Sequence, residues 1–242
     1  MLWKVIFLHK NEKKEEKSNE IYDVAAFLPF WNDISADHQE DIVQHMVQRI
    51  FPKGSVLRPY DASAQACLGF VLVKEGQLRA FMLSESGKEV TLYRLFALDV
   101  CLFSASCVMR NIQFDIQVEA EKDTSAWVIP APLCNRLMQQ SLAMADFTNQ
   151  LMASRFSDVM WTLDQILFKS MDSRIAALLL ELAIIEGQNE LSVTHEELAK
   201  HLGTAREVVT RLLKYFQSDG ILVLSRGSIR LLNTKRLQAL AE

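Results

Sequence analysis

The stretch HEELAKHLGTAREVVTRLLKYF, residues 195–216, decides the fold of the C-terminal part of the chain. Its second half has the periodicity of an amphipathic helix with one apolar face. The opposite face gathers, within an arc of roughly 140° at about 100° per residue, the side chains of Arg206, Glu207, Thr210, Arg211 and Lys214. Such a face is typical either of a solvated surface helix or of a helix that meets an anionic partner, and the flanking residues must distinguish the two.

The residues around this stretch have the pattern of two capped helices joined by a turn. Thr194 precedes the first helix and Glu197 follows three residues later, which is the spacing of a capping box. Gly203 interrupts that helix. Thr204 then opens a second helix with Glu207 at its third position, which predicts a second capping box. Two short helices separated by a glycine turn indicate a helix-turn-helix motif.

A β-hairpin is predicted directly after the second helix. Gly220 is a suitable end for that helix. The segments ILVL (221–224) and IRLL (229–232) are joined by SRGS, which places Arg226 at the tip of the hairpin and Arg230 on its flank. Together with the two helices, this hairpin predicts a winged helix-turn-helix, whose second helix enters the major groove of DNA.

In such a motif, the basic face of the second helix is expected to contact the bases and phosphates of DNA. The guanidinium forks of Arg206 and Arg211 match the O6 and N7 acceptors of guanine. Glu207 can accept from a cytosine amino group or cap its own helix, and the two roles are compatible. The residues expected to read bases are Arg206, Glu207, Thr210 and Arg211. The residues expected to contact phosphates, which position the protein without reading sequence, are Thr194, Thr204, Lys214, Arg226 and Arg230.

Composition and charge limit the class of protein. The 242 residues fit one large domain or two ordinary ones, and half of them are hydrophobic. No apolar run approaches the ~20 residues of a membrane span, and the N-terminal LWKVIFLH is followed by KNEKKEEK rather than by a cleavage site. We therefore expect a cytoplasmic protein without a membrane partner, whose four cysteines stay reduced.

The net charge of -4 hides a local basic segment. Between Lys200 and Arg236, eight Lys or Arg residues stand against two acidic residues, so this segment carries +6 and the rest of the chain -10. A basic patch on an acidic protein indicates a confined anionic partner, and double-stranded DNA is the partner that the motif predicts.

The region before the helical half has the pattern of a β-roll. Short helices are expected around FLPFW (27–31), and a longer one through residues 36–50. From Phe51 to Pro130, short β-type runs alternate with turns, which predicts a sandwich or barrel-like roll. These runs are SVLRPY, GFVLV, LRAFML, EVTLYRLF, FDIQVEA and AWVIP.

A long helix should connect the two regions. One regular seam repeats alternately every four and three residues, and all its members except Asn149 are apolar: Ala145, Asn149, Met152, Phe156, Val159, Leu163 and Ile166. Such a stripe is more often internal core, but a helix of about 25 residues, ~38 Å long, between an all-β and an all-α region favours a homodimer helix. A further helix over 173–185 is closed by Gly187.

The predicted fold is α+β: an N-terminal double-stranded, jelly-roll-like β-roll, a long dimerisation helix and a C-terminal winged helix-turn-helix. The expected divisions are an N-terminal extension (1–20), an effector-sensing β-roll (21–140), the dimerisation helix (141–170) and the winged helix-turn-helix DNA-binding domain (171–242).

Over about Ile21 to Leu240, the chain resembles the Crp/Fnr family of bacterial transcription regulators. The likeness is carried by FVLVKEGQLRAFMLSESGKEVTLYRLFALD (70–99), EAEKDTSAWVIP (119–130), the long helix and LGTAREVVTRLLKYFQSDGIL (202–222). The resemblance implies a cyclic-nucleotide-binding-like roll whose effector reorients the DNA-reading helices of a homodimer. RNA polymerase is then a candidate partner.

The family's recognition helix commonly shows Arg-Glu-x-x-x-Arg or Glu-x-x-Ser-Arg. Arg206, Glu207 and Arg211 match the first form, and Thr210 takes the place of serine in the second. The resemblance therefore implies a palindromic site with half-sites similar to TGTGA or TTGA, and the sequence leaves both open.

The effector region departs from the cyclic-AMP-binding members of the family. Their Gly-Glu pair is missing from ALDVCLFSASC (97–107), and Phe114-Asp115 stands where they carry Arg-Ser. Because a carboxylate repels a phosphate, we expect no useful affinity for cyclic AMP. No cysteine precedes Cys67, which argues against the family's N-terminal iron-sulfur cluster, and no cofactor or metal is predicted.

The effector itself stays open. Cys101 and Cys107, spaced C-x5-C, lie where family members contact their effector. Together with Phe114 and Asp115 they are the effector or redox candidates. A thiol pair there can bind a soft metal or form a disulfide, although small buried cysteines that only pack are more common.

The sequence thus predicts a homodimeric transcription regulator gated by a small molecule or a redox signal. Two alternatives remain at this point. One is a cysteine- or metal-based redox module whose helix-turn-helix serves protein contacts. The other is a cupin-like enzyme, which is disfavoured because such rolls hold a metal through histidines and none lies between His45 and His195. No catalytic residue is predicted.

Overall fold

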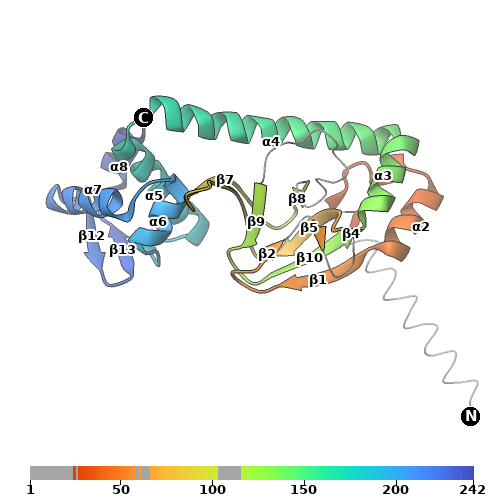
Figure 1. Ribbon diagram of the computed structural model, residues 1–242, viewed down its shortest axis with the longest axis horizontal. Coiled ribbons are helices and arrows are strands. Elements are labelled where there is room, and N and C mark those ends of the chain that lie inside the picture. The colour runs from red at the N-terminus through yellow and green to blue at the C-terminus, as the bar shows by residue number, and fades with distance from the viewer. Residues whose placement is uncertain (1–23, 26, 58–59, 62–65, 103–115) are drawn as a thin grey trace, which may run out of the picture. The chain divides into compact units, whose positions relative to one another are not determined.

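The computed structural model describes residues 24, 25, 27–57, 60, 61, 66–102 and 116–242 (Figure 1). The N-terminal extension expected over 1–20 lies outside these residues. The chain forms two compact units, and each has its own core. The first runs up to Ala80 and continues over Arg94–Phe156, and the second comprises Phe81–Tyr93 and Ser157–Glu242.

The β-roll of the sequence prediction is confirmed. One four-stranded sheet has the order β1 (Val47–Phe51), β10 (Thr124–Ile129), β5 (Phe70–Glu75) and β8 (Val100–Cys101), and its neighbouring strands are antiparallel. A second sheet has the order β2 (Val56–Leu57), β9 (Ile116–Ala120), β6 (Leu78–Leu83) and β7 (Glu89–Leu95). A short pair, β3 (Tyr60–Asp61) and β4 (Ala66–Cys67), completes the described strands of the roll.

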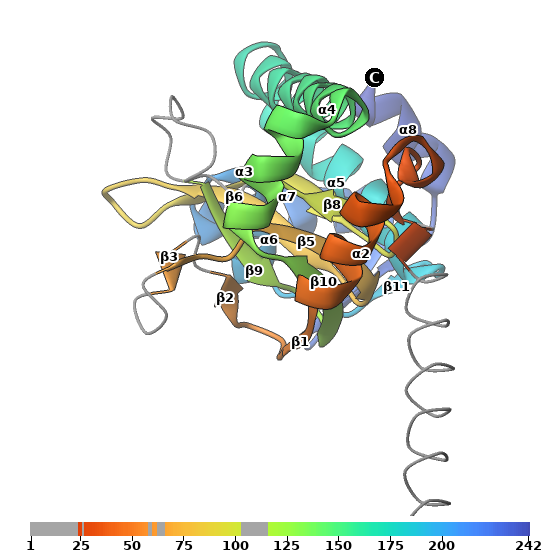
Figure 2. The same cartoon turned by 90° about the vertical axis from the view of Figure 1, so that its right-hand side faces the viewer.

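Helices cover one end of the first sheet. The short helix η1 (Trp31–Asp33), α2 (Ala36–His45) and α3 (Ala131–Gln140) lie there, with α2 beside α3 (Figures 1 and 2). Phe70, Leu72 and Ile129 of the sheet pack with Trp31 and Leu137 of this cover in one buried cluster. Burial of this apolar surface is the main stabilising contribution to the first unit.

The helix expected over 36–50 is shorter than predicted. It ends at His45, Met46 is extended, and the chain continues as β1. β1 pairs with β10 over its whole length, from Val47 opposite Val128 to Phe51 opposite Thr124. The backbone hydrogen bonds of this pairing outweigh the local helical pattern, as tertiary context often does.

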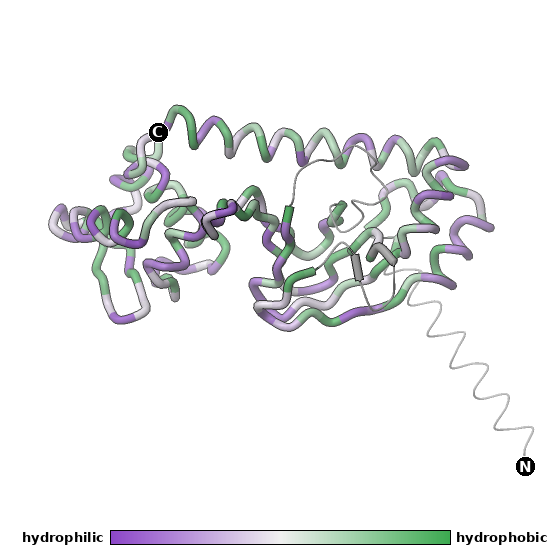
Figure 3. The backbone as a smooth tube through the Cα atoms, viewed as in Figure 1, coloured by the Kyte–Doolittle hydropathy of each residue, from purple (hydrophilic) through white to green (hydrophobic). Residues whose placement is uncertain are grey.

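The long helix is confirmed as α4 (Leu142–Phe168), which has 27 residues. Its turns alternate between hydrophobic and hydrophilic along its length (Figure 3). One face is buried and carries Met144, Thr148, Arg155 and Thr162, and the Thr162 hydroxyl donates to the Leu92 carbonyl at 3.0 Å. None of the described helices is long and apolar enough to span a bilayer.

The predicted seam of α4 lies largely on its exposed side. Asn149, Phe156, Leu163 and Ile166 are exposed, while Met152 and Val159 are half-buried. Met160 and Leu167 are also exposed and extend the apolar stripe along the same side of the helix. An apolar stripe left uncovered by its own chain is what a helix that pairs with a second copy requires.

The winged helix-turn-helix is confirmed in the second unit. Its helices are α5 (Met171–Glu186), α6 (His195–Leu202), α7 (Arg206–Ser218) and α8 (Thr234–Ala241). β12 (Leu222–Ser225) and β13 (Ser228–Leu231) form the predicted hairpin, and β11 (Glu190–Leu191) adds a third strand to it. Val209, Leu213 and Phe216 of α7 are fully buried and pack with Leu179 of α5 and Leu198 of α6.

One of the two predicted capping boxes is present. The Thr194 hydroxyl accepts from the Glu197 amide at 3.1 Å, and the Glu197 carboxylate accepts from the Thr194 amide at 2.7 Å. The prediction for Thr204 is wrong, because the N-cap of α7 is Ala205, without a side-chain cap. Thr204 instead closes α6, since Gly203 has a positive φ of 66° and the Thr204 amide donates to the Ala199 carbonyl.

Gly203 provides a test of the turn between α6 and α7. A Cβ at this position would lie 2.4 Å from Cγ2 of Val90, whereas Gly187 has nearly the same φ of 67° and no heavy atom within 4 Å of a built Cβ. Gly187→Ala is expected to lower the free energy of unfolding by about 1–2 kcal/mol, because alanine is strained in the left-handed backbone conformation. Gly203→Ala is expected to cost about 1–3 kcal/mol more, because valine is stiff and must be displaced. Chemical denaturation of both variants measures the difference, and equal losses would contradict a close Val90 contact.

Candidate nucleic-acid interface

The polar face of α7 gathers four side chains that were expected to read bases and one that was expected to contact phosphate. Arg206, Glu207, Arg211 and Lys214 are exposed, and Thr210 is half-buried. All five line one open hollow of about 500 Å³. Because the opposite face of α7 is fixed in the core by Val209, Leu213 and Phe216, the helix presents this polar face at a defined angle.

The helix α7 begins without a side-chain cap, which bears on the two roles considered for Glu207. The capping-box role is not found, since Ala205 occupies the N-cap position and makes no side-chain hydrogen bond. Glu207 lies in the first turn and is exposed. A carboxylate in the first turn interacts favourably with the helix dipole and is available to a hydrogen-bond donor from outside.

His195, the first residue of α6, belongs to this surface, although the sequence interpretation did not include it. Its Nδ1 lies 2.9 Å from the Thr210 hydroxyl. Burial lowers the pKa of His195 below its usual value of 6.5, and the positive charges of Arg206 and Lys214 lower it further. The only local signal was its position directly after the N-cap Thr194, because its partner is 15 residues away in the sequence.

The other expected phosphate contacts lie on several elements. Thr194 is exposed, and its hydroxyl also donates to Glu197. Arg226 is exposed in the turn between β12 and β13, and Arg230 is exposed on β13 opposite Val223. Neither wing arginine lines the hollow of α7. Thr204 is half-buried in the turn between α6 and α7.

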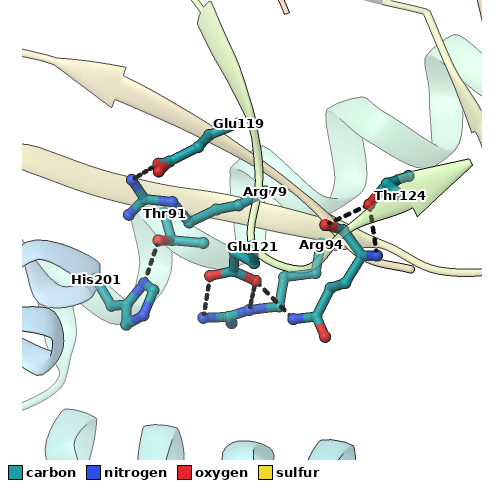
Figure 4. Close-up of polar contacts among 8 residues, drawn as sticks. Arg79, Thr91, Arg94, Glu119, Glu121, Thr124 and His201 are labelled. Carbon is teal, nitrogen blue, oxygen red and sulfur yellow. Dashed lines mark hydrogen bonds and ion pairs between the residues drawn. The ribbon is translucent and has the colours of Figure 1, made fainter. Parts of the chain in front are cut away.

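The outer part of the β6–β7 hairpin contacts α6 within the second unit. Thr91 Oγ1 and Nδ1 of His201 form a hydrogen bond of 2.9 Å, which is the contact drawn in Figure 4. Glu89 Oε1 lies 3.7 Å from the ammonium nitrogen of Lys200. On the α5 side, the Arg174 guanidinium donates to the Leu202 carbonyl at 2.7 Å. These contacts hold the C-terminal end of α6, and therefore the turn that leads into the polar face of α7.

The roll contains two ion pairs in which the arginine is buried and the carboxylate is half-buried, and the structure describes only part of the expected effector site. Arg79 pairs with Glu119 and Arg94 with Glu121, each at 2.9 Å (Figure 4). Gln77 donates to Glu121 at 2.6 Å. Among the described residues, no cluster of three or more His, Cys, Asp or Glu side chains has the arrangement of a metal site.

Of the four effector or redox candidates, the structure describes one. Cys101 is only 1% exposed. Cys107, Phe114 and Asp115 lie outside the described residues, so the C-x5-C pair stays a prediction. The thiol of Cys134 donates to the Ile129 carbonyl at 3.4 Å, and burial raises its pKa to about 12. A thiol with so high a pKa is not a nucleophile, which agrees with a packing role.

Comparisons with known proteins agree with this architecture. A family model described as a Crp-like helix-turn-helix domain matches residues 173–240. A crystal structure described as a transcriptional regulator of the Crp/Fnr family from Eubacterium rectale is 49% identical, covers 89% of this chain and 98% of its own, and superimposes with a TM-score of 0.84.

Two relatives known by name extend the similarity. The cyclic AMP receptor protein of Thermus thermophilus is 24% identical over 214 residues, which are 88% of this chain and 96% of that protein. The transcriptional activator protein FnrA of Stutzerimonas stutzeri is 28% identical over 180 residues, which are 70% of this chain and 71% of that protein.

Fold, site and relatives define a DNA-binding transcriptional regulator with a winged helix-turn-helix. The chain belongs to the Crp/Fnr family. Its relatives are transcriptional regulators, and the protein is one of these rather than an enzyme.

Proposed function

We propose that the protein is a homodimer that reads a palindromic DNA site through α7. The observation that carries this proposal is the hollow of about 500 Å³ on α7, lined by two arginines, a lysine, a threonine and a carboxylate. These groups supply the donors and the acceptor that major-groove edges require. The hollow is open, which suits contact with a groove edge rather than enclosure of a small ligand.

Each side chain of the polar face has a role in this proposal. Arg206 and Arg211 donate to guanine O6 and N7, and Glu207 accepts from a cytosine amino group. Thr210 also meets a base edge. Lys214 and the wing arginines Arg226 and Arg230 neutralise backbone phosphates, and the uncharged Thr194 and Thr204 also contact the backbone. The match of Arg206, Glu207 and Arg211 to the family pattern supports half-sites similar to TGTGA or TTGA.

The exposed stripe of α4 supports the two-fold arrangement. Phe156 is 67% exposed and Leu163 is 42% exposed, although both are large apolar residues. A second copy of this helix would cover them through heptad packing. A two-fold dimer then presents two copies of α7 about one helical turn of DNA apart, ~34 Å, which is why the site should be palindromic.

The proposal names the class of effector but not the individual compound. One relative is by name a receptor of cyclic AMP, but the Phe114-Asp115 pair of this chain argues against a phosphate-bearing ligand. The absence of cysteines before Cys67 argues against the N-terminal iron-sulfur cluster of the family. We therefore propose a different small molecule or a thiol-based signal at Cys101 and Cys107. RNA polymerase stays a candidate partner.

Replacing Arg211 with alanine tests the proposal. The loss of one bidentate base contact is expected to cost about 1–3 kcal/mol, roughly 5- to 150-fold in affinity, on a specific duplex. Genomic fragments selected by the wild-type protein, with and without an oxidant, supply that duplex and also test the thiol signal. Affinity is measured by gel-shift titration.

Arg136→Ala is the matched control. Arg136 is an exposed arginine on α3, in the first unit, that pairs with Asp41. Its replacement removes the same charge and should leave the affinity for the selected duplex unchanged. Equal affinities of the Arg211 variant and the wild type would contradict base reading by α7. A protein that selects no fragment would favour the alternative, in which the helix-turn-helix contacts another protein.

A further inference from the structure

His195 and Thr210 connect the start of α6 to the polar face of α7. The ring nitrogen Nδ1 and the Thr210 hydroxyl lie 2.9 Å apart, and Thr210 is also one of the five residues that line the hollow. His195 is half-buried. The imidazole therefore sits at the edge of the surface on which DNA is proposed to bind, one hydrogen bond away from a residue of that surface.

The charges that act on His195 come chiefly from α7. Arg206 and Lys214 both oppose its protonation. On α6 itself, Glu196 is exposed, and Glu197 accepts from the Thr194 amide and hydroxyl. Of these two carboxylates on α6, that of Glu197 is therefore already engaged by the capping box.

The charged groups of the other elements packed on α6 make contacts with residues other than His195. α5 packs against α6, and the Glu186 carboxylate at its C-terminal end accepts from the Ser192 amide at 3.5 Å. Arg174 of α5 bonds to Leu202, at the far end of α6. The pairs Glu89–Lys200 and Thr91–His201 also lie at that far end.

Protonation of the ring changes what Thr210 can offer to DNA. A neutral imidazole with its proton on Nε2 accepts at Nδ1, and the Thr210 hydroxyl then donates its hydrogen to the ring. A protonated imidazole donates from both nitrogens, so the Thr210 oxygen accepts instead. The Thr210 hydrogen is then released toward the hollow, and the ring carries a positive charge beside it.

We propose that duplex DNA binds to this surface together with a proton taken from solvent, which His195 holds, so that the Thr210 hydroxyl hydrogen is directed toward the DNA and the imidazolium lies beside the DNA phosphates. The inference rests on the proposed function of α7. It makes His195 a positioning residue for Thr210 and a fourth cation beside Arg206, Arg211 and Lys214.

The direction of the pH dependence follows from the charges. In the free protein, burial and the two cations hold the pKa of His195 below 6.5. In the complex, DNA phosphates offset Arg206 and Lys214, so the pKa of His195 rises. Between these two pKa values the complex holds more protons than the free protein, and affinity increases as the pH falls. Below the lower pKa both states are protonated and the gain is complete.

The test is a set of DNA titrations from about pH 8 to about pH 5.5 at constant ionic strength. One duplex carries inverted TGTGA half-sites, and a second has a scrambled sequence, because a phosphate effect is independent of sequence. The wild-type protein is expected to bind both about three- to tenfold more tightly at the low end, since one pKa unit of difference is tenfold in affinity. Calorimetry in two buffers of different ionisation enthalpy should show net uptake of protons near pH 6.5.

Substitutions separate this histidine from other titrating groups. His195→Gln should bind with little dependence on pH and without proton uptake, and His195→Arg should bind tightly throughout. His38→Gln, on α2 in the first unit, should keep the wild-type pH profile. Circular dichroism checks that each variant is folded.

The outcomes distinguish this inference from the proposed function. A pH profile of His195→Gln identical to the wild type would overturn the inference and leave DNA binding by α7 in place. Binding of neither duplex at any pH would remove the proposed function, and the inference with it. A flat profile in His195→Gln alone, with loss of proton uptake, supports both.

Discussion

Replacing Phe216 with alanine is expected to lower the free energy of unfolding of the second unit by about 3–5 kcal/mol. Phe216 is completely buried, and it packs in the cluster that joins α7 to α5, α6 and the wing. Removal of the ring leaves a cavity that the surrounding helices fill only in part, so the cost exceeds the transfer free energy of the ring itself.

Tyr215 supplies the matched control for this prediction. It is the neighbouring aromatic residue on α7, but it is 57% exposed. Tyr215→Ala should change the free energy of unfolding by less than about 1 kcal/mol. Guanidinium titrations of the full chain, followed by far-UV circular dichroism, compare the two variants. Similar losses in both would mean that α7 does not dock on the core through the face described here.

The double substitution Phe156→Glu with Leu163→Glu is expected to convert the proposed dimer to a monomer. These residues lie seven positions apart on the exposed apolar stripe of α4. Carboxylates in a heptad seam are desolvated and repel the same groups of the second copy. Because a monomer engages one half-site at a time, its affinity for a palindromic duplex should fall by about 100-fold or more.

Trp161→Glu is the control for the seam. Trp161 is 59% exposed on the same helix, but at about 100° per residue it lies roughly 140° from Phe156 around the axis. This variant should stay a dimer in light scattering and keep its affinity for DNA. A monomeric Trp161 variant together with a dimeric double variant would place the interface on the other side of α4.

The features that the sequence predicted well are those encoded locally. The Thr194–Glu197 capping box, the glycine turn and the β12–β13 hairpin each depend on residues a few positions apart. Their side chains satisfy backbone groups of their own segment, so the pattern is sufficient to predict them. The same reason explains why α7 and its polar face were identified from the sequence.

The features that the sequence did not predict depend on partners far away in the chain. β1 became a strand because β10, more than 70 residues later, pairs with it. Thr204 does not cap α7, because the left-handed backbone of Gly203 directs the Thr204 amide to the Ala199 carbonyl at the end of α6. His195 acquired its place in the site only when α6 was packed against α7. In each case tertiary contacts outweighed a local pattern or created a new one.

The division of the chain into its two units has a practical consequence for dissecting the regulator. The outer part of the β6–β7 hairpin, Phe81–Tyr93, clusters with the winged helix-turn-helix although more than 60 residues separate them in sequence. A fragment that starts at Ser157 would lack the Leu92 carbonyl that Thr162 bonds and the Val90 side chain beside Gly203. The DNA-binding half is therefore a discontinuous folding module, and cutting the gene at a single point would excise it incomplete.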